Sequence, residues 1–94
     1  MGKHDLALQN ANQALIRCES ALVDFLSDPN NKLNKEKLTE KVRYVAISYH
    51  NVGVEEEHRK NYQQSLEWYE KAYLVFEEYS VLDEPLYIKF KNSY

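Results

Sequence analysis

Residues that break helices or cross-link chains are scarce in this sequence. Its 94 residues include two glycines, two prolines and one cysteine. So few turn-forming residues argue against a β-sandwich or barrel, which needs a turn about every 8–12 residues. Neither G-x-G-x-x-G nor G-x-x-x-x-G-K-[ST] occurs, so we expect no dinucleotide or P-loop site. One cysteine cannot form an internal disulfide, which argues against a stapled secreted scaffold and favours a reducing, cytoplasmic location.

A basic excess and a long hydrophobic run are also missing. The net charge is −3 with a pI of about 5.6, whereas nucleic-acid modules carry a basic stripe and a high pI. No apolar run approaches the ~20 residues of a membrane span. We therefore expect neither a nucleic-acid partner nor a membrane association. Aromatic residues make up 13% of the chain, enough apolar area to favour a folded single domain over 1–94 rather than disorder.

Apolar residues recur at three- and four-residue steps in four segments, which is the period of amphipathic helices. The pattern predicts helices over 3–26, 35–58 and 62–79 and a partial helix over 84–94. Pro29 lies in the connector 27–34, and Asn34 is placed to cap the second helix through its side chain. The fold class is therefore all-α, with about four helices.

The segments form an internal repeat. The third matches the first at an offset of 58, which places Leu66 on Leu8, and the fourth matches the second at an offset of 41, which places Asn92 on Asn51. Two helix types thus alternate, in the order B–A–B–A.

The unit from 46 to 79 resembles a tetratricopeptide repeat. It carries Tyr49-x₂-Val52-Gly53 on the first helix and Ser65-x₃-Tyr69 on the second, in the family's order. The spacing of the A helices is nearer 41 than about 34, which is similar to the longer repeats of kinesin light chains. The resemblance implies an antiparallel helix-hairpin array, a fragment of a right-handed superhelix, with Gly53 at a close helix crossing.

In that family the first helices line a groove that binds peptides. The resemblance therefore implies a protein–protein interaction scaffold or adaptor with a peptide or helix in the A-helix groove. Asn51 and Asn92 would form a ladder that bonds the partner's backbone, and Lys91 would meet a carboxylate. The corresponding groove positions are Ile47, His50, Asn51, Val54, Glu57, His58, Ile88, Lys91 and Asn92.

The short array leaves an alternative open. Helix-hairpin repeats need neighbours to stack on, usually about three in all, so the chain is a piece of a longer array or it associates with itself. In the second case the aromatic faces of 62–94 would pack on another copy or a larger complex, without a peptide ligand.

The chain shows no pattern for catalysis or metal binding. His50 and His58 lie two helical turns apart, about 10–12 Å along the axis, too far for one ion. Neither H-E-x-x-H nor C-x-x-C occurs, and Cys18 falls on an apolar stripe as a buried thiol does. We expect no enzyme, no cofactor and no metal.

Overall fold

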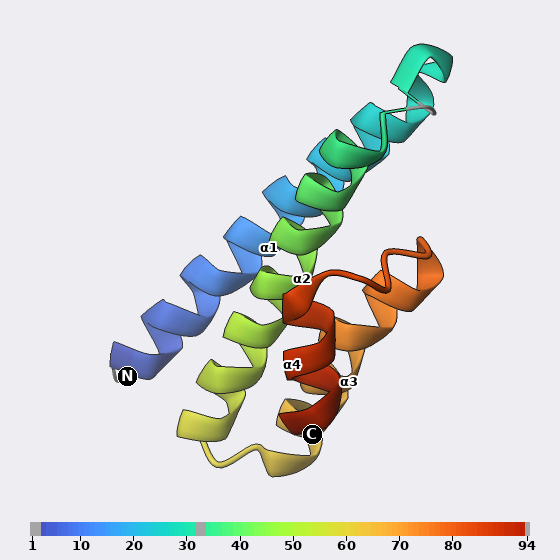
Figure 1. The fold of residues 1–94 in the computed structure, drawn as a ribbon. Helices are drawn as coiled ribbons and strands as arrows, with labels where there is room; N and C mark the ends of the chain where they lie inside the picture. Colours follow the sequence, from blue (N-terminus) through green and yellow to red (C-terminus); the bar gives the residue numbers. More distant parts are fainter. Residues whose placement is uncertain (1–2, 32–33, 94) are drawn as a thin grey trace.

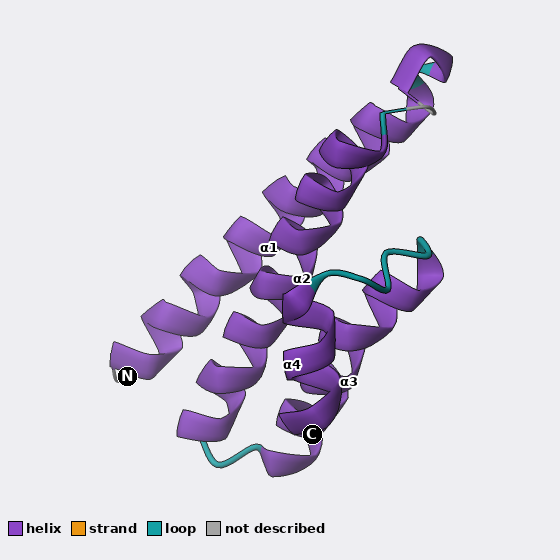
Figure 2. Cartoon of the chain, in the orientation of Figure 1, coloured by secondary structure: helices purple, strands orange, loops and turns teal. Residues whose placement is uncertain are grey.

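The computed structural model describes residues 3–31 and 34–93, with side chains from residue 6. Within these ranges the chain is helical and has no strand (Figure 2), so the all-α prediction is confirmed. Its elements are α1 (Lys3–Ser27), a 3₁₀ turn (Pro29–Asn31), α2 (Lys35–His58), α3 (Tyr62–Glu78) and α4 (Pro85–Ser93).

The helix α2 lies at the centre of the fold. It runs antiparallel to α1 on one side and to α3 on the other, and the short α4 packs against α3 beside α2 (Figure 1). The α1–α2 hairpin extends well beyond the connection between α3 and α4 (Figure 1). The molecule is accordingly elongated and flat, with extents of 45 × 27 × 16 Å.

The start of α2 follows the sequence prediction. The Asn34 side chain accepts a hydrogen bond from the Lys37 backbone N–H over 3.1 Å. This bond satisfies one of the donors that the first helical turn leaves unpaired.

The ends of α2 and α3 share one geometry that the sequence did not reveal. Lys60 and Ser80 adopt left-handed backbone conformations, with φ of 65° and 57°. The N–H of Asn61 bonds Glu56 O, and the N–H of Val81 bonds Phe76 O. Each end is a Schellman motif built without the usual glycine.

A glycine at Lys60 is expected to stabilise the protein. The left-handed conformation costs a residue with a Cβ roughly 1 kcal/mol, and glycine escapes that cost. Lys60→Gly should raise the free energy of unfolding by about 0.5–1 kcal/mol, measured by urea denaturation. Substitution by glycine at Glu70, which is exposed in the middle of α3, is the control and should destabilise by about 1 kcal/mol. Equal losses of unfolding free energy at both sites would show that the left-handed conformation of Lys60 is not strained.

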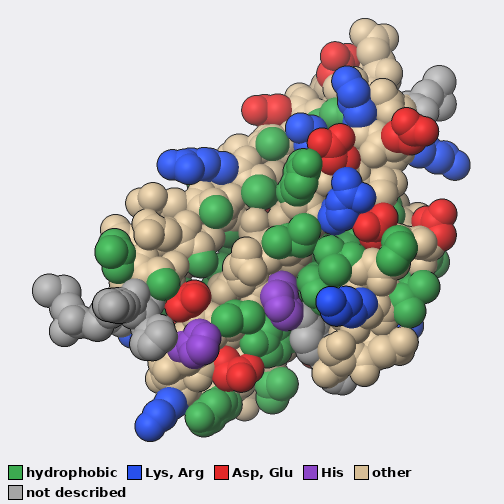
Figure 3. Space-filling model, turned by 60° about the vertical axis from the view of Figure 1, so that its left-hand side comes forward, with side chains coloured by type: hydrophobic (Ala, Val, Ile, Leu, Met, Phe, Trp, Pro, Cys, Tyr) green, Lys and Arg blue, Asp and Glu red, His purple; other side chains and the backbone are tan. Residues whose placement is uncertain are grey.

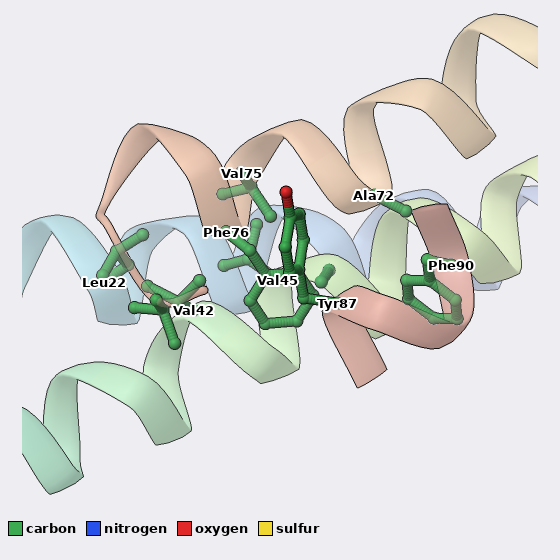
Figure 4. Packing of buried hydrophobic residues seen from close by; sticks show 10 residues of the cluster. Leu22, Val42, Val45, Ala72, Val75, Phe76, Tyr87 and Phe90 are labelled. Atoms are coloured by element: carbon green, nitrogen blue, oxygen red, sulfur yellow. The ribbon is translucent and has the colours of Figure 1, made fainter. Parts of the chain in front are cut away.

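One hydrophobic core joins the four helices. Phe76 of α3 is fully buried and meets Tyr87 of α4 edge-on, with ring centroids 5.9 Å apart (Figure 4). The α1 and α2 helices add aliphatic side chains from the other side. The buried cluster consists of Leu22, Val42, Val45, Ala46, Ala72, Val75, Phe76, Val81, Tyr87 and Phe90.

Gly53 lies at the crossing of α2 and α3, as predicted. A Cβ at this position would stand 2.7 Å from Cδ1 and Cε1 of Tyr69 and 3.3 Å from Ser65 O. The Ser65 hydroxyl donates to Gly53 O over 2.9 Å. The missing side chain therefore lets the two helices approach until a hydroxyl reaches the facing backbone.

Gly53→Ala should destabilise the protein although alanine is the better helix former. The clash with the Tyr69 ring should outweigh the gain in propensity of about 1 kcal/mol and leave a net loss of roughly 1–2 kcal/mol, measured by thermal or urea unfolding. In a Tyr69→Leu background the same change should cost much less. An equal cost in both backgrounds would show that the ring is not the obstacle.

Candidate partner-binding face

The outward side of α2 carries four of the predicted site residues. Ile47, Asn51, Val54 and His58 recur at steps of four, three and four, so they share one helix face. Ile47 keeps 37% of its surface exposed, Asn51 and His58 are exposed, and Val54 is half-buried. We call these four residues the α2 face.

His50 and Glu57 turn instead toward the neighbouring helices. The His50 ring stacks on Phe90 of α4, with centroids 4.8 Å apart and planes 8° apart, and lies 5.2 Å from the Tyr69 ring of α3. The Tyr69 hydroxyl donates to Glu57 Oε1 over 2.9 Å. The His50 ring therefore contacts both α3 and α4, whereas the exposed Glu57 contacts α3 at the surface.

The packing around His50 lowers its pKa below the usual 6.5. Burial is the main cause, since it disfavours the charged imidazolium, and the positive charge of Lys89 adds to it. Glu57 acts in the opposite direction. The neutral ring is thus the form that fits between α3 and α4.

Of the three predicted site residues on α4, two are exposed and one contacts a neighbouring helix. Ile88 is 51% exposed, and Asn92 is exposed. Lys91 differs from the expectation, because its Nζ lies 3.6 Å from Glu77 Oε2 and donates to the Tyr87 hydroxyl over 3.2 Å. These contacts direct Lys91 to α3, where its carboxylate partner comes from the same chain.

The same kind of hydrogen bond occurs in the α1–α2 pair and in the α3–α4 pair. The Tyr49 hydroxyl of α2 donates to Glu19 of α1 over 3.3 Å, and the Tyr87 hydroxyl of α4 donates to Glu77 of α3 over 2.8 Å. The glutamates are 58 residues apart, the offset predicted for the B helices, but the tyrosines are 38 apart. The contacts thus favour an offset of 38 rather than 41 for the A helices.

The corrected offset changes which residues correspond. Lys89, rather than Asn92, takes the place of Asn51, and its charge acts on His50. Comparison of the two segments did not identify Lys89 as a site residue, because an offset of 41 aligns two identical residues, Asn51 and Asn92. The sequence did contain one sign of the offset of 38, since Tyr49 and Tyr87 are separated by that number of residues. Each of these tyrosines bonds a glutamate of the preceding helix.

The structure also forms hollows away from the α2 face. One, of about 470 Å³, lies between the start of α2 and the connection from α3 to α4, lined in part by Leu38, Tyr79 and Leu82. Shallow hollows along α1 meet at Ile16. Figure 3 shows hydrophobic side chains scattered among charged ones over one side of the molecule, with histidine side chains between them.

Within the described residues, no cluster of histidine, cysteine, aspartate and glutamate has the size to hold a metal ion. None of the described helices combines the length and apolarity that crossing a membrane requires. Comparison of the chain with family models, curated proteins and solved structures finds no match in any of the three.

The lowered pKa of His50 predicts a pH-dependent stability. In the unfolded chain the imidazole titrates near 6.5, and in the folded chain it titrates lower. The unfolded state therefore binds more protons between these values, and stability is lost as the pH falls below 6.5.

Urea unfolding at pH 7.5 and pH 5.5 tests this expectation. The wild type should lose more free energy of unfolding across this interval than His50→Gln, which cannot titrate. His58→Gln, at an exposed position of the same helix, should behave as the wild type does. A wild-type loss no larger than that of His50→Gln would contradict the assignment.

Proposed function

We propose that this protein is a protein–protein interaction scaffold or adaptor that binds a partner peptide or helix along the α2 face. The observation that carries the proposal is the exposure of Ile47 and Asn51 side by side on the central helix. An exposed isoleucine supplies apolar contact area, and an exposed amide next to it offers both a donor and an acceptor. This combination suits an extended or helical polypeptide.

The neighbouring helix adds to the same surface. Ile88 of α4 is half-exposed, and Lys89 contributes a positive charge near His50. The offset of 38 puts Lys89 in the place that Asn51 holds on α2. A partner that crosses from α2 to α4 would therefore meet an amide first and an ammonium group next.

The support for a tetratricopeptide-like array comes from the packing. Four helices in antiparallel order and a glycine at the α2–α3 crossing fit such an array, and the Tyr–Glu contact is made twice along the chain. A rigid two-helix crossing is a platform for binding rather than an enclosed pocket for chemistry, so we propose a binding role without catalysis, cofactor or metal.

The cysteine supports a reducing, cytoplasmic setting. Cys18 is half-buried, and its Sγ accepts a hydrogen bond from the Ser48 hydroxyl over 3.3 Å. The thiol thus acts as a packing group between α1 and α2.

A displayed random-peptide library tests the proposal. Peptides selected on the immobilised wild-type protein are measured by fluorescence anisotropy against variants. Asn51→Ala should weaken binding about five- to tenfold, since it removes hydrogen bonds worth about 1–1.5 kcal/mol, and Ile47→Asp should weaken it further. Both positions are exposed, so circular dichroism should show an unchanged fold.

Glu70→Ala on α3 is the matched control. Glu70 is also an exposed polar residue in the middle of a helix, but it lies away from α2. Its variant should bind as the wild type does. Peptides whose affinity falls with Glu70→Ala and not with Asn51→Ala would place the binding surface elsewhere and refute the proposal.

A further inference from the structure

The α2 face continues toward the start of the helix through Tyr44. Tyr44 lies three residues before Ile47, a spacing that makes two side chains neighbours on a helix. It keeps 45% of its surface exposed. Tyr44 and Ile47 therefore offer a continuous apolar surface on the central helix of the fold.

Two contacts hold the Tyr44 side chain in place. Its hydroxyl donates to Glu40 Oε1 over 3.1 Å, one turn nearer the start of α2. The guanidinium carbon of Arg43 lies 6.0 Å from the centroid of the Tyr44 ring, at the limit of a cation–π contact. Because the ring is already oriented, it loses less conformational freedom on binding than a mobile side chain does.

Arg43 is itself held by a residue next to α4. Its Nη1 lies 3.4 Å from Glu84 Oε1, in an ion pair where the Glu84 side chain is only 14% exposed but that of Arg43 is 38% exposed. The carboxylate is thus largely covered, whereas the guanidinium is open to solvent. A guanidinium carries several N–H donors, so Arg43 can bind a second carboxylate while it keeps Glu84.

Arg43, Tyr44 and Ile47 form one cluster, which we call the anchor cluster. Arg43 precedes Ile47 by four residues and Tyr44 precedes it by three, so both side chains neighbour Ile47 on the helix surface. Tyrosine and arginine are enriched among the residues that dominate the binding energy of interfaces. The anchor cluster combines an apolar surface with one positive charge at its edge.

The solvent-exposed charges beside the anchor cluster are mainly positive. Lys89 of α4 is exposed, and its charge acts on His50 of α2. Of the nearby carboxylates, Glu84 is largely covered, and Glu40 accepts the Tyr44 hydroxyl. An acidic segment of a partner is therefore attracted to this surface, although the chain as a whole has a net charge of −3.

We propose that the anchor cluster selects acidic peptides: an apolar side chain of the partner packs on Tyr44 and Ile47, and a neighbouring aspartate or glutamate side chain pairs with Arg43. This inference rests on the proposed function and adds the chemistry of the partner to it. Tyr44 supplies contact area, and Arg43 determines specificity through its charge.

Peptides selected from the displayed library on the wild-type protein test the role of Arg43. They should contain aspartate or glutamate more often than the unselected library. Each is synthesised with an amidated C-terminus, once as selected and once with its acidic residues replaced by the matching amides. The wild type should bind the amide version about three- to tenfold more weakly in fluorescence anisotropy. Arg43→Gln should bind both versions equally, because the charge that distinguishes them is missing.

Glu84→Gln and Lys41→Gln are the matched controls. Glu84→Gln breaks the same ion pair but keeps the positive charge of Arg43, so the preference for the acidic peptide should persist. Lys41→Gln removes a positive charge that borders Ala21 and Phe25 of α1, and the preference should again persist. A preference lost with either control, or absent from the wild type, would overturn the proposal.

Substitutions of Tyr44 test the apolar part of the anchor cluster. Tyr44→Ala should weaken binding of the selected peptides roughly tenfold or more, as at other interface tyrosines, whereas Tyr44→Phe keeps the ring and should weaken it much less. Tyr62→Ala is the control, since Tyr62 is 60% exposed at the start of α3, and it should bind as the wild type does. A loss with Tyr62→Ala and not with Tyr44→Ala would contradict the assignment.

Asn51→Ala separates this inference from the proposed function. Peptides that depend on Asn51 but respond to neither Arg43→Gln nor Tyr44→Ala would leave the proposed function intact and overturn the anchor cluster. Peptides that respond to none of the three variants, or a library that yields no binder, would refute both proposals.

Discussion

The close approach of α2 and α3 at Gly53 is the constraint on which the rest of the structure depends. Because Gly53 has no Cβ, the Tyr69 ring lies directly against the α2 backbone. Its hydroxyl then reaches Glu57, and its ring reaches His50. His50 in turn stacks on Phe90, so the position of α4 follows from a contact made two helices earlier.

The same local contacts and helix ends occur twice along the chain. Each A helix donates a tyrosine hydroxyl to a glutamate of the preceding B helix, and α2 and α3 both end at a left-handed residue that is not glycine. The halves differ mainly in helix length. Glu19 and Tyr49 are 30 residues apart because α1 continues to Ser27 and α2 begins at Lys35, whereas Glu77 and Tyr87 are only 10 apart because α3 ends at Glu78 and α4 begins at Pro85. The additional helical turns of α1 and α2 form the projecting end of the α1–α2 hairpin (Figure 1).

The outward surface of α2 has one proposed use. The α2 face combines an isoleucine and an amide on the helix that is held from both sides, which suits a partner that needs a rigid platform.

The sequence by itself determined the helices, because apolar periodicity is local: 35–58 was predicted with the bounds that α2 has, and Asn34 caps it as expected. It also placed Gly53 at a crossing. Only the tertiary structure decided that Lys91 faces Glu77 and Lys89 lies near His50. A nine-residue helix with aromatic residues on several sides fits more than one register, and contacts from α2 and α3 select among them.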